Sequence, residues 1–219
     1  MTKKTAKNNE VIKLEIQEEK KRNRFDYKKI IETIDPGSKV LDLGCGTGTL
    51  LRLLKEKKQI DGRGIELSQE KVKRCIEHGL SVLHGDLDEG LKHYRDKSFD
   101  YVIFNQTIQV VKNSLHVLKE ALRVGKKVIV SFPNFGHWKI RKSFFFSGRM
   151  PKSKSLPYEW YNTPNIRLLT VYDFRDICKK NKIKVLAEYD YLKKNNKSRQ
   201  IRIWPNLFAS NSLFVVEEK

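Results

Sequence analysis

Apolar residues recur at helical spacing near the start of the chain. They predict a helix that Pro36 and Gly37 bring to an end. The apolar positions of this helix are Tyr27, Ile30, Ile31 and Ile34. Residues 1–22 instead alternate Lys and Glu with few apolar positions. We therefore predict a flexible basic extension there, ahead of one domain over residues 23–219.

Five short apolar runs follow, and each is typical of a buried strand. They are residues 39–43, a run that ends near Glu66, and residues 80–84, 99–104 and 127–132. The intervening segments have helical patterns, and one of these helices is capped by Ser68, runs to His78 and ends at Gly79. Nearly continuous apolar strands separated by helices predict an α/β fold, in which helices cover both faces of a mostly parallel sheet.

The pattern breaks between residues 133 and 170, which we interpret as an insert within the domain. Four prolines, two tryptophans and three consecutive phenylalanines at 144–146 interrupt any regular periodicity there. Beyond the insert, residues 171–181 predict a helix, and residues 183–192 and 212–216 predict two further strands. For residues 193–199 we predict an exposed polar loop.

A glycine-rich turn joins the first predicted strand to the helix after it. Gly44, Gly46 and Gly48 let a ligand approach the backbone at the helix N-terminus. We assign Asp42, near the end of the strand, and Cys45, within the turn, to the same binding site. A dinucleotide-binding G-x-G-x-x-G pattern would need its third glycine one residue later, so the spacing argues against NAD. We interpret Cys45 as a small residue that the turn requires rather than as a nucleophile.

Carboxylates stand at the ends of the next two predicted strands. Glu66 follows Gly48 by 18 residues, in the position from which a carboxylate accepts both ribose hydroxyls of a nucleoside. Asp86 follows the third strand, where a carboxylate can accept the adenine amino proton. The apolar neighbours Leu67 and Leu87 are assigned to the same site. Each carboxylate alone is equally typical of a solvated strand end, but in this order they predict a nucleoside-binding site.

Polar residues follow the fourth strand at the point where a substrate would lie beside the nucleoside. We assign Asn105 and Gln106 to this site, although a polar loop cap would have the same composition. The segment after the fifth strand adds His137 and aromatic side chains, which form either a second wall or part of the core. The candidates for catalysis are His137 or Tyr161 as a base, and Asn105, Gln106 or Asn134 as orienting groups.

The net charge of +19 is the one compositional extreme. Lys and Arg outnumber Asp and Glu by twelve to three over residues 138–184, against sixteen to twelve over residues 40–130. The chain is lysine-rich throughout, so solvated faces explain this excess better than nucleic-acid binding.

Cysteine usage and the length of the apolar runs restrict the function further. Cys45, Cys75 and Cys178 are few and far apart, which predicts reduced thiols and no metal cluster. No apolar run approaches the roughly 20 residues that span a bilayer. We expect a cytoplasmic protein without a membrane partner.

Many of these segments resemble the MetW family of S-adenosylmethionine-dependent methyltransferase-like proteins. They are residues 40–48, 64–68, Asp86, 99–109 and 131–138, with insert motifs at 148–151, 156–158, 160–161 and 163–166. The resemblance extends over about residues 29–192. Its cofactor motifs belong to the whole superfamily, whereas the insert motifs are specific to the family. Arg167 stands where we expect the family to have histidine.

The resemblance implies a Rossmann-like methyltransferase fold, with a seven-stranded sheet whose last strand is antiparallel. It implies S-adenosylmethionine as cofactor, with S-adenosylhomocysteine as the product. It also implies a role in methionine biosynthesis in association with homoserine O-acyltransferase. No methyl acceptor follows from it.

Two main functional hypotheses are compatible with these features. In the first, which the resemblance favours, the chain is a nucleotide-binding partner of the acyltransferase and docks through the insert at 133–170. In the second, it is an independent methyltransferase acting on a small molecule, with catalysis by positioning and exclusion of water. An RNA methyltransferase, suggested by the charge alone, ranks last. The Asn-Pro-Pro-Tyr motif of amino-group methyltransferases is absent from the sequence, which argues against base or amide N-methylation.

Overall fold

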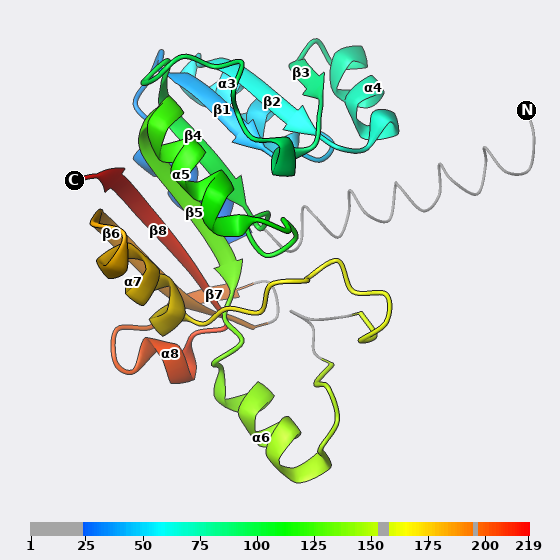
Figure 1. Cartoon of the computed structure of the whole chain (residues 1–219), viewed down its shortest axis with the longest axis vertical. Coiled ribbons are helices and arrows are strands. Elements are labelled where there is room, and N and C mark those ends of the chain that lie inside the picture. Colours follow the sequence, from blue (N-terminus) through cyan, green and yellow to red (C-terminus); the bar gives the residue numbers. More distant parts are fainter. Residues whose placement is uncertain (1–23, 153–157, 195–196) are drawn as a thin grey trace, which may run out of the picture.

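The computed structural model describes residues 24–152, 158–194 and 197–219, so the predicted extension at 1–22 lies outside the described residues. The strands are β1 (Lys39–Leu43), β2 (Asp61–Glu66), β3 (Ser81–His84), β4 (Phe99–Asn105), β5 (Gly125–Pro133), β6 (Ile183–Lys194), β7 (Lys197–Gln200) and β8 (Asn211–Glu218). They form one sheet in the order β3-β2-β1-β4-β5-β8-β6-β7 (Figure 1). Strands β1 to β5 are parallel, and β8 runs antiparallel to β5, as the resemblance implied.

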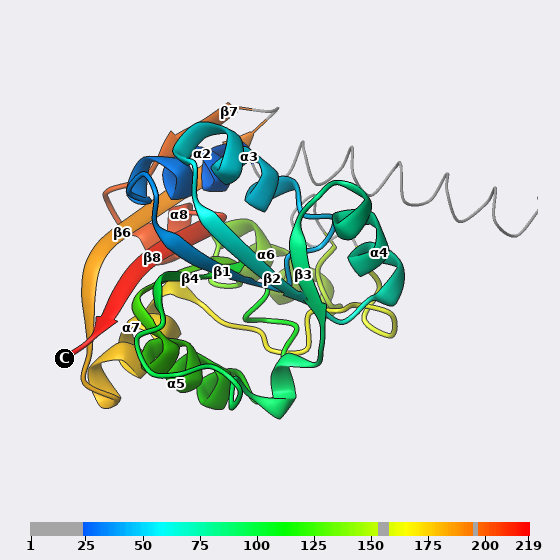
Figure 2. The ribbon, with the colours of Figure 1, turned by 90° about the horizontal axis from the view of Figure 1, so that it is seen from above.

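Helices cover both faces of this sheet. The helices are α2 (Arg24–Thr33), α3 (Thr49–Lys58), α4 (Gln69–Glu77), α5 (Ser114–Val124), α6 (Trp138–Ser147), α7 (Val171–Lys180) and α8 (Pro205–Phe208), and the short 3-10 helix η1 spans Leu87–Glu89. Figure 2 shows α2 and α3 on one side of the sheet and α5 and α7 on the other. Helix α6 instead projects away from the sheet, below the end of β5 (Figure 1).

Successive residues of the central strands alternate between two hydrophobic cores. In β4, Tyr101 and Ile103 belong to the core under α2 and α3, whereas Val102 and Phe104 belong to the core under α5 and α7. All four side chains are at most 3% exposed. Because side chains of a strand point alternately to opposite faces, a continuous apolar run is what a sheet covered on both faces requires.

Several strands and helices begin or end at the residues that the sequence predicts. Strand β1 occupies residues 39–43, and Ser68 caps α4 by accepting a hydrogen bond from the Lys71 N–H at 3.5 Å. Helix α7 begins with a capping box, in which Thr170 and Asp173 each bind the backbone N–H of the other. These short-range polar signals set helix starts without help from the rest of the fold.

The described residues correct two expectations for the second half of the chain. We predicted a loop over 193–199 and seven strands, but β7 pairs antiparallel with the end of β6 and makes an eighth strand. This edge strand is polar on both faces, so no alternation marks it. Helix α6 lies within the predicted irregular insert. None of its residues is buried, and its phenylalanines are consecutive rather than spaced by three or four residues, so no core-facing stripe marks it as a helix.

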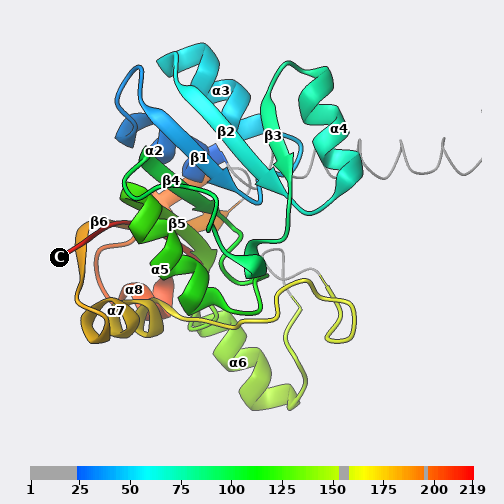
Figure 3. The same ribbon diagram turned by 45° about the horizontal axis from the view of Figure 1, so that its top comes forward.

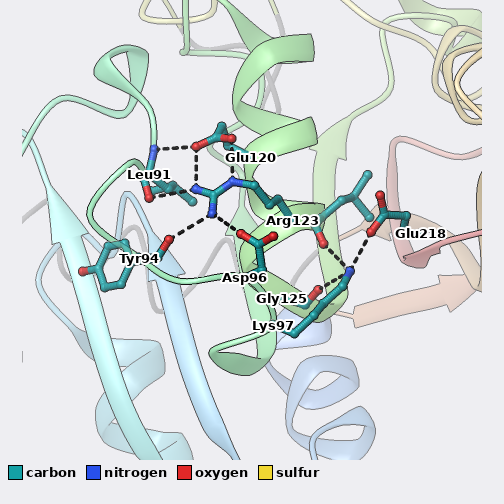
Figure 4. Close-up of polar contacts among 9 residues, drawn as sticks. Leu91, Tyr94, Asp96, Lys97, Glu120, Arg123, Gly125 and Glu218 are labelled. Atoms are coloured by element: carbon teal, nitrogen blue, oxygen red, sulfur yellow. Dashed lines mark hydrogen bonds and ion pairs between the residues drawn. The ribbon is translucent and has the colours of Figure 1, made fainter.

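An arginine-centred network ties the segment after η1 to α5 (Figure 4). The Arg123 guanidinium donates to both Glu120 carboxylate oxygens at 2.9 and 2.8 Å, to Asp96 at 2.6 Å, and to the backbone carbonyls of Leu91 and Tyr94. Hydrogen bonds to Glu120 and Asp96 raise the pKa of Arg123, so it stays charged. One side chain thereby holds the connection that leads from the end of β3 into β4.

Gly48 is required by both backbone conformation and packing, which gives a stability prediction. Its φ is +74°, and an added Cβ would lie 2.3 Å from Leu80 Cδ1 and 3.0 Å from Cys75 Sγ. We expect Gly48→Ala to lower the free energy of unfolding by about 2–4 kcal/mol, from left-handed strain plus overpacking. Gly79→Ala is the matched control, because Gly79 has φ +69° but open space around it. Gly79→Ala should lower the free energy of unfolding by only about 1–2 kcal/mol. Urea unfolding measures both variants, and equal losses of stability would contradict the packing argument.

Candidate nucleoside-binding site

The candidate site lies at the carboxyl edge of the parallel strands, where the strand order reverses between β1 and β4. In open α/β sheets such a reversal leaves a crevice for ligands. The turn after β1 contains Gly44, Gly46 and Gly48 with φ of +72°, +60° and +74°. All three adopt the left-handed conformation that glycine adopts readily. The N-cap residue of α3 is Gly48, which has no side chain to cap the helix, and the N-terminus of the helix faces the turn.

Glu66 holds this turn in place. Its Oε2 accepts a hydrogen bond from the Gly46 N–H at 2.9 Å, and its Oε1 accepts one from the Ser68 N–H at 2.9 Å. The side chain is 9% exposed at the end of β2. Each carboxylate oxygen has a second lone pair, so both can still accept a hydroxyl from a ligand. The predicted residue is therefore next to the predicted turn, with acceptor capacity left over.

Cys45 is a packing residue within the turn. It is buried against Gly64 on the adjacent strand, where an added Cβ would come within 2.6 Å of the Cys45 sulfur. Its interaction with Cys75, together with burial, raises the pKa of the Cys45 thiol, so the thiolate does not form near neutral pH. This supports our interpretation of Cys45 as a small residue rather than a nucleophile. All three cysteines are buried, and none forms a disulfide.

Apolar and acidic groups flank Glu66 on the side predicted for a base. Leu67 is 62% exposed although it directly follows a buried strand end. Asp86 caps η1, with its Oδ1 accepting the Asp88 N–H at 2.9 Å, and Leu87 is buried beneath it. Leu67 is thus available to cover a flat ring, whereas Leu87 is mostly taken up by the core.

Asn105 and Gln106 are joined through Ser131 on the neighbouring strand. The Ser131 hydroxyl donates to Asn105 Oδ1 at 3.0 Å, and the Ser131 carbonyl accepts the Gln106 N–H at 3.1 Å. Gln106 has φ +58°, uncommon for a residue with a side chain. The end of β4 is therefore a fixed polar surface next to the glycine turn, since Thr107 packs where a Gly44 Cβ would be.

A buried acid lies behind this surface, and sequence reasoning missed it. Asp26 in α2 is 1% exposed, and it accepts hydrogen bonds from the Tyr191 hydroxyl and, at 3.3 Å, from Gln106 Nε2. Burial raises the pKa of Asp26 to about 6, against the opposing effects of Tyr191, Lys193 and Gln106. One feature of the sequence indicates its burial. Asp26 precedes Ile30 by four residues, so it lies on the apolar face of the helix, which packs against the core.

His137 lies at the start of α6, deep in the loop after β5. It is 5% exposed, and its Nδ1 accepts the Lys139 N–H at 3.4 Å. Burial, and then the charge of Lys139, lower the pKa of His137, so the ring is neutral near pH 7. With Nδ1 accepting, the proton lies on Nε2, which has no hydrogen-bond partner among the described residues. In this tautomer His137 is a hydrogen-bond donor rather than a base.

Asn134 and Tyr161, the other candidates for catalysis, make their contacts within the insert and with α8. The Asn134 amide donates to the Asn206 and Ala209 carbonyls at 3.1 and 2.8 Å and accepts the Gly136 N–H at 2.9 Å, so it holds the loop after β5 against α8. Tyr161 is 70% exposed and contacts Trp160 edge to face. The described contacts bring neither side chain to the glycine turn.

Arg167, which departs from the expected family pattern, anchors the insert. Its guanidinium donates twice to the Lys112 carbonyl, at 3.0 and 2.6 Å. The N–H groups of Ile166 and Arg167 also donate to the Gln109 carbonyl at 3.0 and 2.9 Å. The end of the insert is thus bound to the loop that follows β4, close to the candidate site in sequence.

Comparison with known families identifies the chain. The model of the family described as methionine biosynthesis protein MetW matches residues 24–216, nearly all of the described chain. The chain belongs to the MetW family. A bifunctional methionine biosynthesis protein MetXA/MetW of Rhodopirellula baltica is 40% identical to it over 161 residues. These cover 69% of the chain but only 26% of the relative, so the MetW chain spans about a quarter of that protein.

Other relatives of this MetW-family chain are methyltransferases. A demethylmenaquinone methyltransferase of Listeria welshimeri is 30% identical over 133 residues, which cover 54% of the chain and 56% of that enzyme. A solved S-adenosylmethionine-dependent methyltransferase of Thermotoga maritima, a possible histamine N-methyltransferase, aligns with TM-score 0.65 at 20% identity. The alignment covers 90% of the chain and 91% of that structure. At this identity the likeness establishes the Rossmann-like methyltransferase fold alone.

The described residues of this MetW-family chain contain no helix long and apolar enough to cross a membrane. They also contain no cluster of three or more His, Cys, Asp or Glu side chains able to hold a metal ion.

The buried Asp26 gives this site a characteristic pH dependence. Its pKa in the fold, about 6, lies above the ordinary 3.8, so ionisation opposes folding. The contribution of Asp26 to stability is therefore highest below pH 4 and falls as pH rises through 6. The shift of about two units corresponds to roughly 3 kcal/mol. We expect the unfolding free energy of wild type minus that of Asp26→Asn to fall by about this amount between pH 4 and 7.

Asp100→Asn is the control for this measurement. Hydrogen bonds from the Lys126 ammonium and the Lys39 N–H lower the pKa of Asp100, so its contribution has the opposite slope and is lost as pH falls. Urea unfolding at a series of pH values measures both differences. A pH-independent difference for Asp26→Asn would show that Asp26 is not held in a raised-pKa environment.

Proposed function

We propose that the chain binds S-adenosylmethionine at the glycine turn and that this binding serves methionine biosynthesis. The Glu66 carboxylate carries the proposal, because it is fixed by the Gly46 and Ser68 N–H groups and keeps free lone pairs at the carboxyl end of β2. Such a carboxylate suits the two ribose hydroxyls of the cofactor.

The remaining groups fit the other parts of the cofactor. The exposed Leu67 would cover one face of the adenine, with Asp86 beside it. The N-terminus of α3, which begins after Gly48, suits the carboxylate of the amino acid part. Asn105 and Gln106 would line the site beyond the sulfonium. When bound, the cofactor would supply a methyl group already activated by the sulfonium charge. The chain itself would bind and orient the reacting groups and exclude water.

Calorimetric titration of the chain with S-adenosylmethionine and with S-adenosylhomocysteine tests this site. We expect Gly46→Asp to abolish binding, because a side chain at φ +60° would crowd the turn and its charge would repel Glu66. Leu67→Ala should weaken binding about five- to tenfold through lost apolar contact, with an unchanged unfolding midpoint. Leu186→Ala, at a leucine 39% exposed on β6, is the matched control. If both Leu67→Ala and Gly46→Asp bind as wild type does, the proposed site is wrong.

The proposed partner is homoserine O-acyltransferase. The bifunctional relative joins a MetXA part and a MetW part in one polypeptide, which favours contact between the two proteins where they are separate chains. The insert offers a surface for such contact, because Phe144, Phe145 and Phe146 of α6 are 54%, 82% and 76% exposed. Contiguous exposed apolar side chains of this kind are typical of protein-binding surfaces.

Co-purification with the purified acyltransferase tests the partnership. We expect Phe145→Ser combined with Phe146→Ser to abolish co-purification while the unfolding midpoint is retained, since neither ring is buried. Ile203→Ser removes a side chain 75% exposed outside the insert and should leave co-purification intact. If the wild-type chain does not co-purify, the partnership is wrong; if the double variant still does, the docking face lies elsewhere.

An independent small-molecule methyltransferase is the second candidate function. The 30% identity to a demethylmenaquinone methyltransferase over 133 residues favours a catalytic use of the cofactor site. Measuring the methyl-transfer rate with and without the acyltransferase distinguishes the two functions. An independent enzyme keeps its methyl-transfer rate in the absence of the acyltransferase, whereas a dependent subunit does not.

A further inference from the structure

A cavity lies outside the candidate nucleoside site, between the start of the insert at Phe135 and its later residues from Arg149 to Leu168. Its volume is about 520 Å³, within the range of small-molecule sites. Phe135, Tyr158 and Trp160 line it with aromatic rings, and Arg149, Lys152 and Glu159 contribute charged groups. None of the residues that we assign to the nucleoside lines this cavity.

The charges that line the cavity leave one cation without a counter-ion. Lys152 and Glu159 form an ion pair with each other, so together they add little net charge. The Arg149 guanidinium has no ion-pair partner in the described part of the chain. It follows Gly148, which ends α6 with φ +61° and turns the chain at that point. A planar guanidinium with free donors matches the two oxygens of a carboxylate or sulfonate.

The aromatic walls favour a flat apolar body for the ligand. Trp160 and Tyr158 are 73% and 41% exposed, and Phe135 is half-buried. Exposed aromatic rings that line a cavity offer stacking surface to a ligand. These three rings and the Arg149 guanidinium line the same cavity.

The cavity is also attached to the functional edge of the sheet. Phe135 stands two residues after the end of β5, and its N–H donates to the Leu169 carbonyl at 3.1 Å. Figure 3 shows the insert beyond the ends of β4 and β5, on the side of the sheet where the glycine turn lies. We propose that this cavity binds a small organic anion with a flat apolar body, stacked on Trp160 and held at its charged end by Arg149.

A charged dye and an uncharged analogue of it test this proposal without the cofactor. The probes are 8-anilinonaphthalene-1-sulfonate and N-phenyl-1-naphthylamine, titrated by fluorescence against the full chain. We expect the sulfonate to bind with one site per chain. Arg149→Gln should weaken it about tenfold, equivalent to about 1.4 kcal/mol, and leave the uncharged probe within twofold. Trp160→Ala should weaken both probes.

Arg202→Gln and Trp204→Ala are the matched controls. Arg202 is an exposed arginine near the exposed Trp204, and neither lines the cavity. Both controls should bind the sulfonate as wild type does. The proposal is overturned if the sulfonate does not bind, if Arg149→Gln and Arg202→Gln weaken it equally, or if Arg149→Gln weakens the two probes equally. Loss of cofactor binding in the separate titration would leave this result unaffected, because the probes are used alone.

Discussion

The candidate site depends on two hydrogen bonds that the Glu66 carboxylate accepts from the backbone. One carboxylate at the end of β2 accepts an N–H from the turn after β1 and another from the start of α4. Two strand-to-helix turns are thereby fixed relative to one another by a single side chain. The positive-φ glycines and the carboxylate therefore hold their relative positions before any ligand arrives, which lowers the ordering cost of binding.

Hydrogen bonds also connect β4 and β5 at the carboxyl edge of the sheet. Ser131 links Asn105 and Gln106, and Gln106 in turn reaches the buried Asp26. Asp26 comes from α2 and also accepts from Tyr191 of β6, so a buried acid joins both ends of the domain behind the site. Burying a carboxyl group is unfavourable unless it is hydrogen-bonded. The positive φ of Gln106 and the buried acid together mark the end of β4 as a constrained part of the molecule.

The first half of the fold could be predicted from sequence because its signals are local. The apolar runs for β1 to β5, the capping Ser68 and the glycine turn each depend on neighbouring residues, and Glu66 follows from its spacing alone. The features that the sequence did not predict have two other causes. Strand β7 and helix α6 bury little, so no hydrophobic period marks them. The use of Asn134 as a structural clamp depends on carbonyls more than 70 residues away, which no local pattern encodes.

Helix α6 shows how the insert differs physically from the rest of the domain. A helix of ten residues is marginal by itself, and those on the sheet are stabilised by the apolar faces that they bury. Helix α6 buries none of its residues; polar contacts hold it at both ends. His137 caps its start, Arg141 Nε donates to the Gly136 carbonyl at 2.6 Å, and Gly148 closes its end. Because these contacts hold the helix without its phenylalanines, that apolar face is free to contact a partner. A fixed backbone with three exposed phenylalanines is what the proposed docking surface would need.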